Sequence, residues 1–283
     1  MKKIKLAGLI TIFGLTLGLN IKASTLNTET SPAVATITDF SGLVVIKRAD
    51  PGSKWVQARL YTPLEKNDTI KTQNNSSAEI TLEDGSIFRI EHNTELCLQN
   101  LEYSKESKKQ NFIMKLFSGI LLTNAEKTGN PESQIAIHTP TAVLSVRGTE
   151  FVVDIEDENT TNVGVLSGYV SARSYSQDNQ LSKEETMVKV DQETQIKKFQ
   201  PPLKPYALRE RILRHKELLL KLRERRIHIR ANWKNIVANR TKIRQKLRKR
   251  IEANPQLNSP EQRENIKERI QQRNKKQIQN RKR

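Results

Sequence analysis

The chain has 283 residues, of which 35% are hydrophobic, and a formal net charge of +18. This length is sufficient for two domains, and the single cysteine, Cys97, excludes an intramolecular disulfide framework. The charge is uneven, because residues 201–283 contain 27 Lys+Arg and 7 Asp+Glu, a net of +20, whereas the remaining 22 and 24 give −2. A basic tail joined to a nearly neutral body suggests a polyanionic partner for the tail.

Residues 1–23 are predicted to be a signal peptide. Three lysines among the first five residues precede the apolar run 6–19, which is too short for a comfortable membrane span. Ala23 is a candidate for the residue before cleavage, although Ile21 is larger than the residue usual two positions earlier. An uncleaved anchor is therefore the alternative. We expect a periplasmic or secreted bacterial protein.

Residues 33–200 are predicted to form an all-β domain of many short strands. Polar and apolar residues alternate over 78–82, and Asp84-Gly85 before the run 87–90 is a hairpin signal. Cys97 stands in an apolar, strand-like run. It is expected to be a small residue in or near the core and neither a nucleophile nor a ligand.

The pattern apolar-Ser-Gly-apolar-apolar occurs three times, with its glycines at 42, 119 and 168. A glycine that opens a strand permits a sharp bend without a Cβ clash. The glycine spacings of 77 and 49 residues exclude a repeat of fixed period. Short strands entered through such bends indicate a β-solenoid or a sandwich-like arrangement, unless the pattern is a coincidence of common residues.

Three runs carry a resemblance to a known family: Ile-His-Thr-Pro-Thr-Ala-Val at 137–143, Val-Arg-Gly-Thr-Glu-Phe at 146–151, and Val-Gly-Val-Leu-Ser-Gly-Tyr-Val at 163–170. Together with upstream residues, they resemble the periplasmic domain of the FecR family over roughly residues 35–195. The resemblance implies an extracytoplasmic β-fold with a binding role. The best-known members are transmembrane regulators that sense a loaded outer-membrane receptor and control a sigma factor. Here only five residues precede the apolar run, so any signalling is expected to need a separate membrane partner.

The residues of this motif are predicted to have structural roles. Residues before proline avoid helix, so the Thr-Pro pair reads as an extended entry to a strand. The arginine of Arg-Gly-Thr could donate hydrogen bonds to nearby carbonyls or pair with Glu150 or Asp154. A structural role, in which it links neighbouring parts of the domain, is favoured over ligand binding. In the strand that follows, alternate residues share a face. The predicted structural residues are Thr139, Pro140, Arg147, Gly148, Thr149, Phe151 and Gly168.

No catalytic, cofactor-binding or metal-ligating set is predicted, so the protein is expected not to be an enzyme and to need no cofactor. Ser145, His138 and Asp154 could form a triad on paper, but no Gly-x-Ser-x-Gly turn surrounds the serine. The histidines do not cluster, and one cysteine gives no metal-ligand spacing.

Residues 201–205, with three prolines, are predicted to be a linker to a basic helical tail over 206–283. From Leu208 to Leu247, a seam of mostly apolar residues recurs at spacings of four and three, which predicts a long amphipathic helix whose coiled-coil-like seam allows self-association. His215, Arg226 and Arg240 interrupt the seam. Asn254-Pro255 should end this helix, and Ser259-Pro260 should begin a second, weaker one.

A cluster of cations predicts polyanion binding, formed by Lys246, Arg248, Lys249 and Arg250. Anionic lipid, lipopolysaccharide or wall polymer fits an exported chain better than nucleic acid does. A solvated helical stalk is the alternative. The sequence thus predicts an exported, non-enzymatic binding protein of the cell envelope, whose tail self-associates or contacts a polyanion. The alternative function is a component of FecR-type extracytoplasmic signalling that acts through a separate membrane partner.

Overall fold

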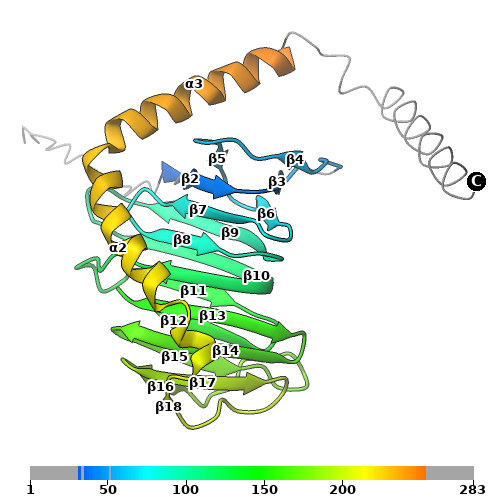
Figure 1. Ribbon diagram of the computed structural model, residues 1–283, viewed down its shortest axis with the longest axis vertical. Helices are drawn as coiled ribbons and strands as arrows, with labels where there is room; N and C mark the ends of the chain where they lie inside the picture. The colour runs from blue at the N-terminus through cyan, green and yellow to red at the C-terminus, as the bar shows by residue number, and fades with distance from the viewer. Residues whose placement is uncertain (1–30, 33–34, 51, 253–283) are drawn as a thin grey trace, which may run out of the picture.

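The computed structural model of the 283-residue chain describes residues 31–32, 35–50 and 52–252. Two β-sheets face each other across one hydrophobic core, and three helices follow them in the chain (Figure 1). The many short strands confirm the predicted β-rich class. The signal segment and the region around Ser259 lie outside the described residues.

Sheet A is antiparallel except where β10 and β11 run parallel. Its strands, in spatial order, are β4 (Val56–Gln57), β3 (Val44–Lys47), β6 (Thr69–Thr72), β9 (Glu95–Tyr103), the first part of β10 (Gln110–Asn124), β11 (Gln134–His138), β12 (Ala142–Val146), β15 (Tyr169–Ser174) and β16 (Thr186–Lys189). β1 (Ser31–Pro32) pairs with the far end of β9.

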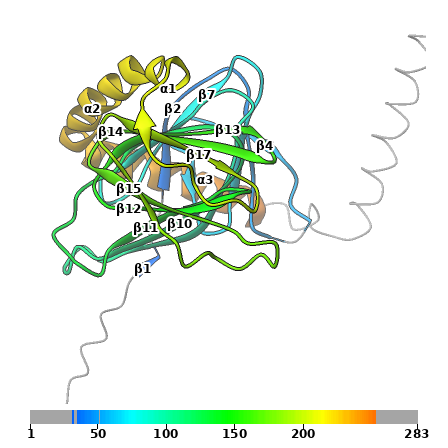
Figure 2. The same cartoon turned by 90° about the horizontal axis from the view of Figure 1, so that it is seen from below.

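Sheet B is antiparallel throughout and shares the long strand β10 with sheet A (Figures 1 and 2). Its strands, in spatial order, are β5 (Pro63–Leu64), β2 (Ala35–Ser41), β7 (Ser77–Thr81), β8 (Ile87–Ile90), the second part of β10, β13 (Glu150–Asp157), β14 (Thr160–Ser167), β17 (Gln192–Lys197) and β18 (Tyr206–Ala207). Antiparallel hairpins reverse the chain within each sheet, so the sandwich-like alternative describes this fold better than a solenoid does.

The three Ser-Gly patterns form three of the corners at which the chain crosses from one sheet to the other. Gly42 leads from β2 to β3, Gly119 bends β10 in its middle, and Gly168 leads from β14 to β15, with φ of 72°, 86° and 80°. These angles are in the left-handed region that favours glycine. At each corner, a Ser or Thr hydroxyl forms a hydrogen bond with the backbone of the residue after the glycine. Ser76 Oγ accepts from the N–H of Leu43 (2.9 Å), and Thr94 Oγ1 accepts from the N–H of Ile120 (3.0 Å). Thr149 Oγ1 donates to the carbonyl of Tyr169 (2.9 Å).

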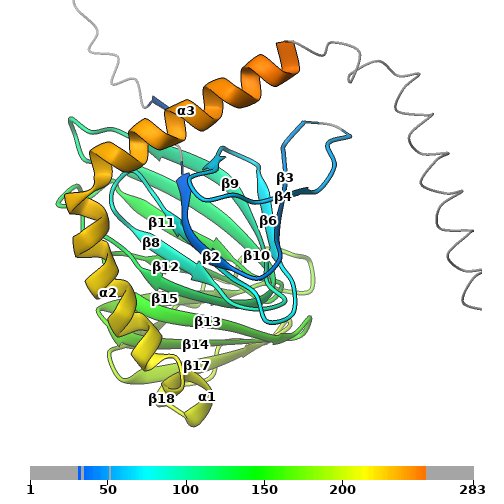
Figure 3. The ribbon, with the colours of Figure 1, turned by 45° about the horizontal axis from the view of Figure 1, so that its top comes forward.

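The helical tail consists of α1 (Glu210–Leu213), α2 (Lys216–Ala231) and α3 (Trp233–Glu252). α1 and α2 run across the outer face of sheet B, and α3 turns away over the end of the sandwich near β2 and β5 (Figures 1 and 3). The prediction of one continuous helix is therefore wrong, because the chain changes direction at Asn232. The N–H of Asn232 closes α2 on the carbonyls of His228 and Ile229. In the described ranges, none of the three helices has the length and apolar content needed to cross a membrane.

Residues 201–205 are extended and lie along the edge of sheet B. The N–H of Leu203 donates to the carbonyl of Gln195 (3.0 Å), and Thr194 Oγ1 donates to the carbonyl of Leu203 (2.6 Å). These bonds hold the segment that leads from the last long strand to the helices against β17.

Candidate functional site: the helix-covered face of sheet B

The helices pack on an apolar strip on the outer face of sheet B. Ile87, Leu122 and Val152 of three neighbouring strands are fully buried although they point away from the core between the sheets. The helical residues packed on them are Ile212, Leu219, Leu222, Ile229 and Ile236. They belong to the seam predicted to self-associate, so the seam is already covered within one chain. The coiled-coil prediction is therefore corrected over this part of the tail.

Gly164 provides the space for the first helical contact. It lies on the outward face of β14, between Val163 and Val165, whose side chains enter the core. A Cβ at position 164 would collide with Cγ2 of Ile212 and lie 3.1 Å from Cδ2 of Leu208. The absence of a side chain at Gly164 lets α1 approach the sheet closely.

Sheet B has an outward row of residues that is charged at its ends and apolar in its middle. The partners in this row follow from the strand registers and are Asp39, Glu79, Arg89, Leu122, Val152, Gly164 and Glu193. Apolar helical residues cover the middle, and arginines of the same helices reach the acids at both ends.

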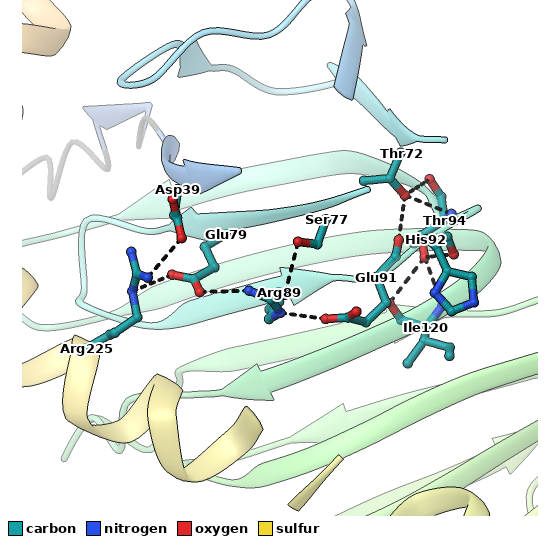
Figure 4. A network of polar contacts seen from close by, with 10 residues as sticks. All are labelled: Asp39, Thr72, Ser77, Glu79, Arg89, Glu91, His92, Thr94, Ile120 and Arg225. Atoms are coloured by element: carbon teal, nitrogen blue, oxygen red, sulfur yellow. Dashed lines mark hydrogen bonds and ion pairs between the residues drawn. The ribbon is translucent and has the colours of Figure 1, made fainter. Parts of the chain in front are cut away.

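At the β2 end of the row, arginines and acids alternate (Figure 4). Arg225 of α2 contacts Asp39 (Nη1–Oδ2 2.9 Å) and Glu79 (Nε–Oε2 2.8 Å). Arg89 contacts Glu79 from the other side (Nη1–Oε1 3.1 Å) and also Glu91 (Nε–Oε1 2.5 Å). Burial raises the pKa of Glu79, and the positive charges of Arg225 and Arg89 oppose that rise. This buried carboxylate therefore depends on both arginines for its charged form.

The polar network continues from Glu91 to the corner turns. Thr72 Oγ1 donates to the carbonyl of Glu91 (2.5 Å) and accepts from the N–H of Thr94 (3.0 Å). Thr94 Oγ1 in turn accepts from the N–H of Ile120 (3.0 Å), at the corner of β10 (Figure 4). The helix contact and the Gly119 corner thus belong to one hydrogen-bonded system.

Most of the other inward arginines of the tail also pair with acids of the β-sandwich. The pairs are Arg209 with Glu193, Arg211 with Asp154 and Glu156 (3.0 Å to Glu156), Arg223 with Glu150 (2.5 Å), Arg226 and Arg230 with Glu126 (3.4 and 2.5 Å), Arg240 with Glu83 (3.0 Å), and Arg244 with Glu65 (2.6 Å). These arginines of the tail are therefore paired with carboxylates of the same chain. These arginines are not free for an external polyanion.

His215 lies at the junction of α1 and α2, beside a groove of about 540 Å³ that His92, Asp154 and Arg211 also line. Its side chain is buried, and burial lowers its pKa. The neutral imidazole is therefore the form that the docked helix favours.

The Thr-Pro-Thr run joins the two sheets. Thr139 Oγ1 accepts from the N–H of Ala142 (3.0 Å), which closes the turn between β11 and β12. Thr141 Oγ1 lies 2.8 Å from Thr161 Oγ1 of sheet B, and all three hydroxyls are buried. Pro140 is half-buried at the tip of this turn. The run therefore links β12 to β14 across the edge of the sandwich.

The Arg-Gly-Thr run forms the corner between β12 and β13. Gly148 has φ of 61°, and Phe151, the second residue of β13, is fully buried in the core. Arg147 is exposed, and its Nη2 donates to the carbonyl of Asn130 (3.3 Å). It pairs with neither Glu150 nor Asp154, because these acids bind arginines of the tail.

The cation cluster predicted in the tail lies at the end of α3. Lys246 and Lys249 are exposed. Arg248 and Arg250 lie in the same helix, but their side chains are outside the described part of the structure.

The structure separates the residues of the conceivable triad. Ser145 pairs with Ala136 and His138 with Val143 in sheet A, whereas Asp154 faces the helices on sheet B. Within the described residues, no three His, Cys, Asp or Glu side chains gather as metal ligands. Cys97 is half-buried between the inward Leu96 and Leu98, so it lies on the outer face of sheet A and not in the core.

Comparison with known proteins assigns part of the sandwich to a protein family. Residues 68–171 match the family described as FecR protein, so the chain contains a FecR domain, and the resemblance seen in the sequence is confirmed. Two crystal structures of a proposed anti-sigma factor from Parabacteroides distasonis, at 1.65 and 2.50 Å resolution, match 49% of this chain with 14% and 15% identity and a TM-score of 0.38 each. The match spans 59% of those chains. A search of curated proteins finds no match.

Sequence reasoning missed the charged face of sheet B. The signal was present in the strands, because Asp39, Glu79, Glu150, Asp154 and Glu193 each occupy an outward position beside core residues. Outward acids in one domain and an arginine-rich amphipathic helix in the same chain together indicate an intramolecular interface.

Proposed function

We propose that the protein is a non-enzymatic component of extracytoplasmic signalling, located in the periplasm or secreted. Its FecR domain binds a protein partner, and its helical tail regulates that binding by occupying the outer face of sheet B. The match to the FecR family supports the regulatory role. The domain division at residues 33–200 and 201–283 belongs to this proposal.

The observation that carries the proposal is the character of the helix contact. Its apolar part is a narrow strip, and the remainder is arginine–carboxylate pairs at the rim, several of them half-exposed. Ion pairs of this kind contribute little net stability and are screened by salt. A partner that offers its own basic or amphipathic helix can therefore compete for the same face.

Photocross-linking in the native envelope tests this function. A photoreactive residue replaces Leu166, a half-buried residue of β14 beside the apolar strip, in the wild type and in Leu222→Glu and Leu220→Glu variants. Leu222 is buried against the sheet, whereas Leu220 on the same helix is 45% exposed, so only Leu222→Glu should loosen the tail. We expect Leu222→Glu alone to increase one protein adduct and to alter the transcript levels of transport genes. If the probe forms adducts only with lipid or polymer and the transcript levels do not change, the proposed signalling function is wrong.

Polyanion contact is a second candidate, favoured by the outward lysines of α3. Lys234, Lys242, Lys246 and Lys249 are exposed, whereas Arg240 and Arg244 of the same helix reach acids of the sandwich. Co-sedimentation of the full chain with anionic and zwitterionic vesicles, at low and high salt, tests it. Equal binding to both vesicle types, or no loss in Lys246→Gln/Lys249→Gln, argues against this candidate.

A further inference from the structure

A pocket of about 450 Å³ opens where two corners and one loop of the sandwich meet. The corner between β12 and β13 contributes Arg147 and Gly148, and the corner between β14 and β15 contributes Gly168 and Tyr169. The loop from β10 to β11 contributes Lys127 and Thr128. This volume is within the range of small-molecule sites in proteins.

Two cations stand at this pocket without an acidic counterpart. Within the described residues, neither Lys127 nor Arg147 takes part in an ion pair, and the Arg147 guanidinium donates to the backbone carbonyl of Asn130. The nearest acids along the chain, Glu126 and Glu150, are bound by Arg230 and Arg223. The pocket therefore keeps a net positive charge, in contrast to the helix-covered face.

A buried hydroxyl in the same wall has no partner. Thr128 is 8% exposed, and its Oγ1 makes no hydrogen bond in the described part of the chain. Leaving a buried hydroxyl unpaired is costly, and such groups are uncommon in folded proteins. Thr128 lines the pocket, so a rotation about its χ1 would present this donor to an acceptor bound there.

Because glycine has no side chain, Gly148 and Gly168 present backbone atoms at this wall. Gly148 has φ of 61° and Gly168 of 80°, conformations that side chains rarely adopt. A Cβ on Gly148 would lie 2.5 Å from Cβ of Lys127, so the lysine stem lies directly against the corner. The two corners thus bring the stem of Lys127 and the side chain of Arg147 to the same wall.

We infer that this pocket is a binding site for an oxyanion group, a carboxylate or a phosphate, held by Arg147 and Lys127 and by the hydroxyl of Thr128. Guanidinium and ammonium groups form the strongest hydrogen bonds with such acceptors. Tyr169 lines the pocket beside these groups. The inference does not rest on the signalling role of the tail, because in the described part of the chain no hydrogen bond or ion pair joins these residues to the helices.

Chemical-shift titration of the ¹⁵N-labelled full chain tests the site, with inorganic phosphate in one arm and N-acetyl-aspartate in the other. We expect saturable shifts of the Gly148 and Gly168 amides in at least one arm, and the arm that binds more tightly identifies the ligand chemistry. Arg147→Gln should weaken binding about tenfold or more. Lys108→Gln, a loss of one cation in another exposed loop, is the matched control and should change affinity less than about twofold.

Thr128→Val separates a ligand-binding role from a structural one. Valine has the same shape and lacks the unpaired hydroxyl, so the melting temperature should stay unchanged or rise, while the anion affinity falls severalfold. The inference is overturned if shifts do not saturate, if Arg147→Gln and Lys108→Gln behave alike, or if Thr128→Val leaves affinity unchanged.

Discussion

Ile212 of α1 lies directly over Gly164 of β14, in space that any side chain at position 164 would fill. The contact joins residues 48 positions apart and sets where the helical tail meets the FecR-type sandwich.

Gly164→Leu should release the tail while leaving the sandwich folded. The backbone of Gly164 is extended, so leucine fits the strand and its side chain displaces Ile212. We expect hydrogen exchange of the α1 and α2 amides to rise at least tenfold, with little change in β13 and β14. Gly129→Leu is the control, since no atom lies within 4 Å of a Cβ built there. Unchanged protection of α2 in Gly164→Leu would contradict this account of docking.

Leu222→Ala should destabilise the helix contact, whereas Leu220→Ala should not. Leu222 is 1% exposed in the apolar strip and Leu220 is 45% exposed, although both lie on α2. Truncating a buried leucine costs about 2–5 kcal/mol. Urea titration followed by helical circular dichroism should show that loss for Leu222→Ala and a change within about 0.5 kcal/mol for Leu220→Ala. Similar midpoints in the two variants would mean that the strip does not hold the helix.

Arg225→Gln should weaken docking by about 1 kcal/mol at low salt, because Glu79 keeps only Arg89 as a partner. The pKa of Glu79 is already raised by burial, and losing Arg225 should raise it further. The effect should therefore shrink on acidification, as Glu79 becomes protonated, and in 0.5 M salt. Lys216→Gln, at an exposed position of the same helix, is the control. An effect independent of both pH and salt would exclude an electrostatic cause.

Asp84 should make the stability of the sandwich depend on pH. Burial raises its pKa to about 6, against hydrogen bonds from the N–H (2.9 Å) and hydroxyl (2.5 Å) of Ser86. The folded state then binds more protons than the unfolded state between pH 3.8 and about 6, so this contribution to stability is lost as pH rises through that window. Asp84→Asn removes the dependence.

The difference in unfolding free energy between Asp84→Asn and the wild type should thus grow in favour of the variant from pH 4 to 6. It should then level off at roughly 1–3 kcal/mol. Parallel pH profiles for Asp84→Asn and the wild type would show that Asp84 is not the group responsible.

Gly119→Ala should destabilise the corner of β10. At φ of 86°, an alanine is strained, and its Cβ would lie 2.6 Å from Cα of Thr94. We expect a loss of about 1–3 kcal/mol in chemical unfolding. Gly129→Ala should be close to neutral, because its Cβ would point into open space. Equal effects at the two glycines would show that loss of chain flexibility, and not the corner geometry, decides the result.

The repeated Ser-Gly pattern and the period-two runs were enough to predict short strands joined by sharp bends, because both depend on local backbone geometry. Arg147-Gly148-Thr149 likewise identified the domain family, yet its pocket with Lys127 could not be predicted. That pocket depends on a loop that returns beside the corner from another strand.

In the helical tail, too, some properties follow from the sequence and others from the tertiary structure. The sequence alone determined that most of the region 208–247 is helical, amphipathic and rich in arginine, since spacing and composition decide these properties. It could not determine what the apolar seam covers, because self-association and docking on sheet B require the same spacing of apolar residues. Only the tertiary structure decided between them. It places Leu122, Val152 and Gly164 in one row beneath the helix and the outward acids around it, so the apolar seam over residues 212–236 and eight arginines of the tail find partners within one chain.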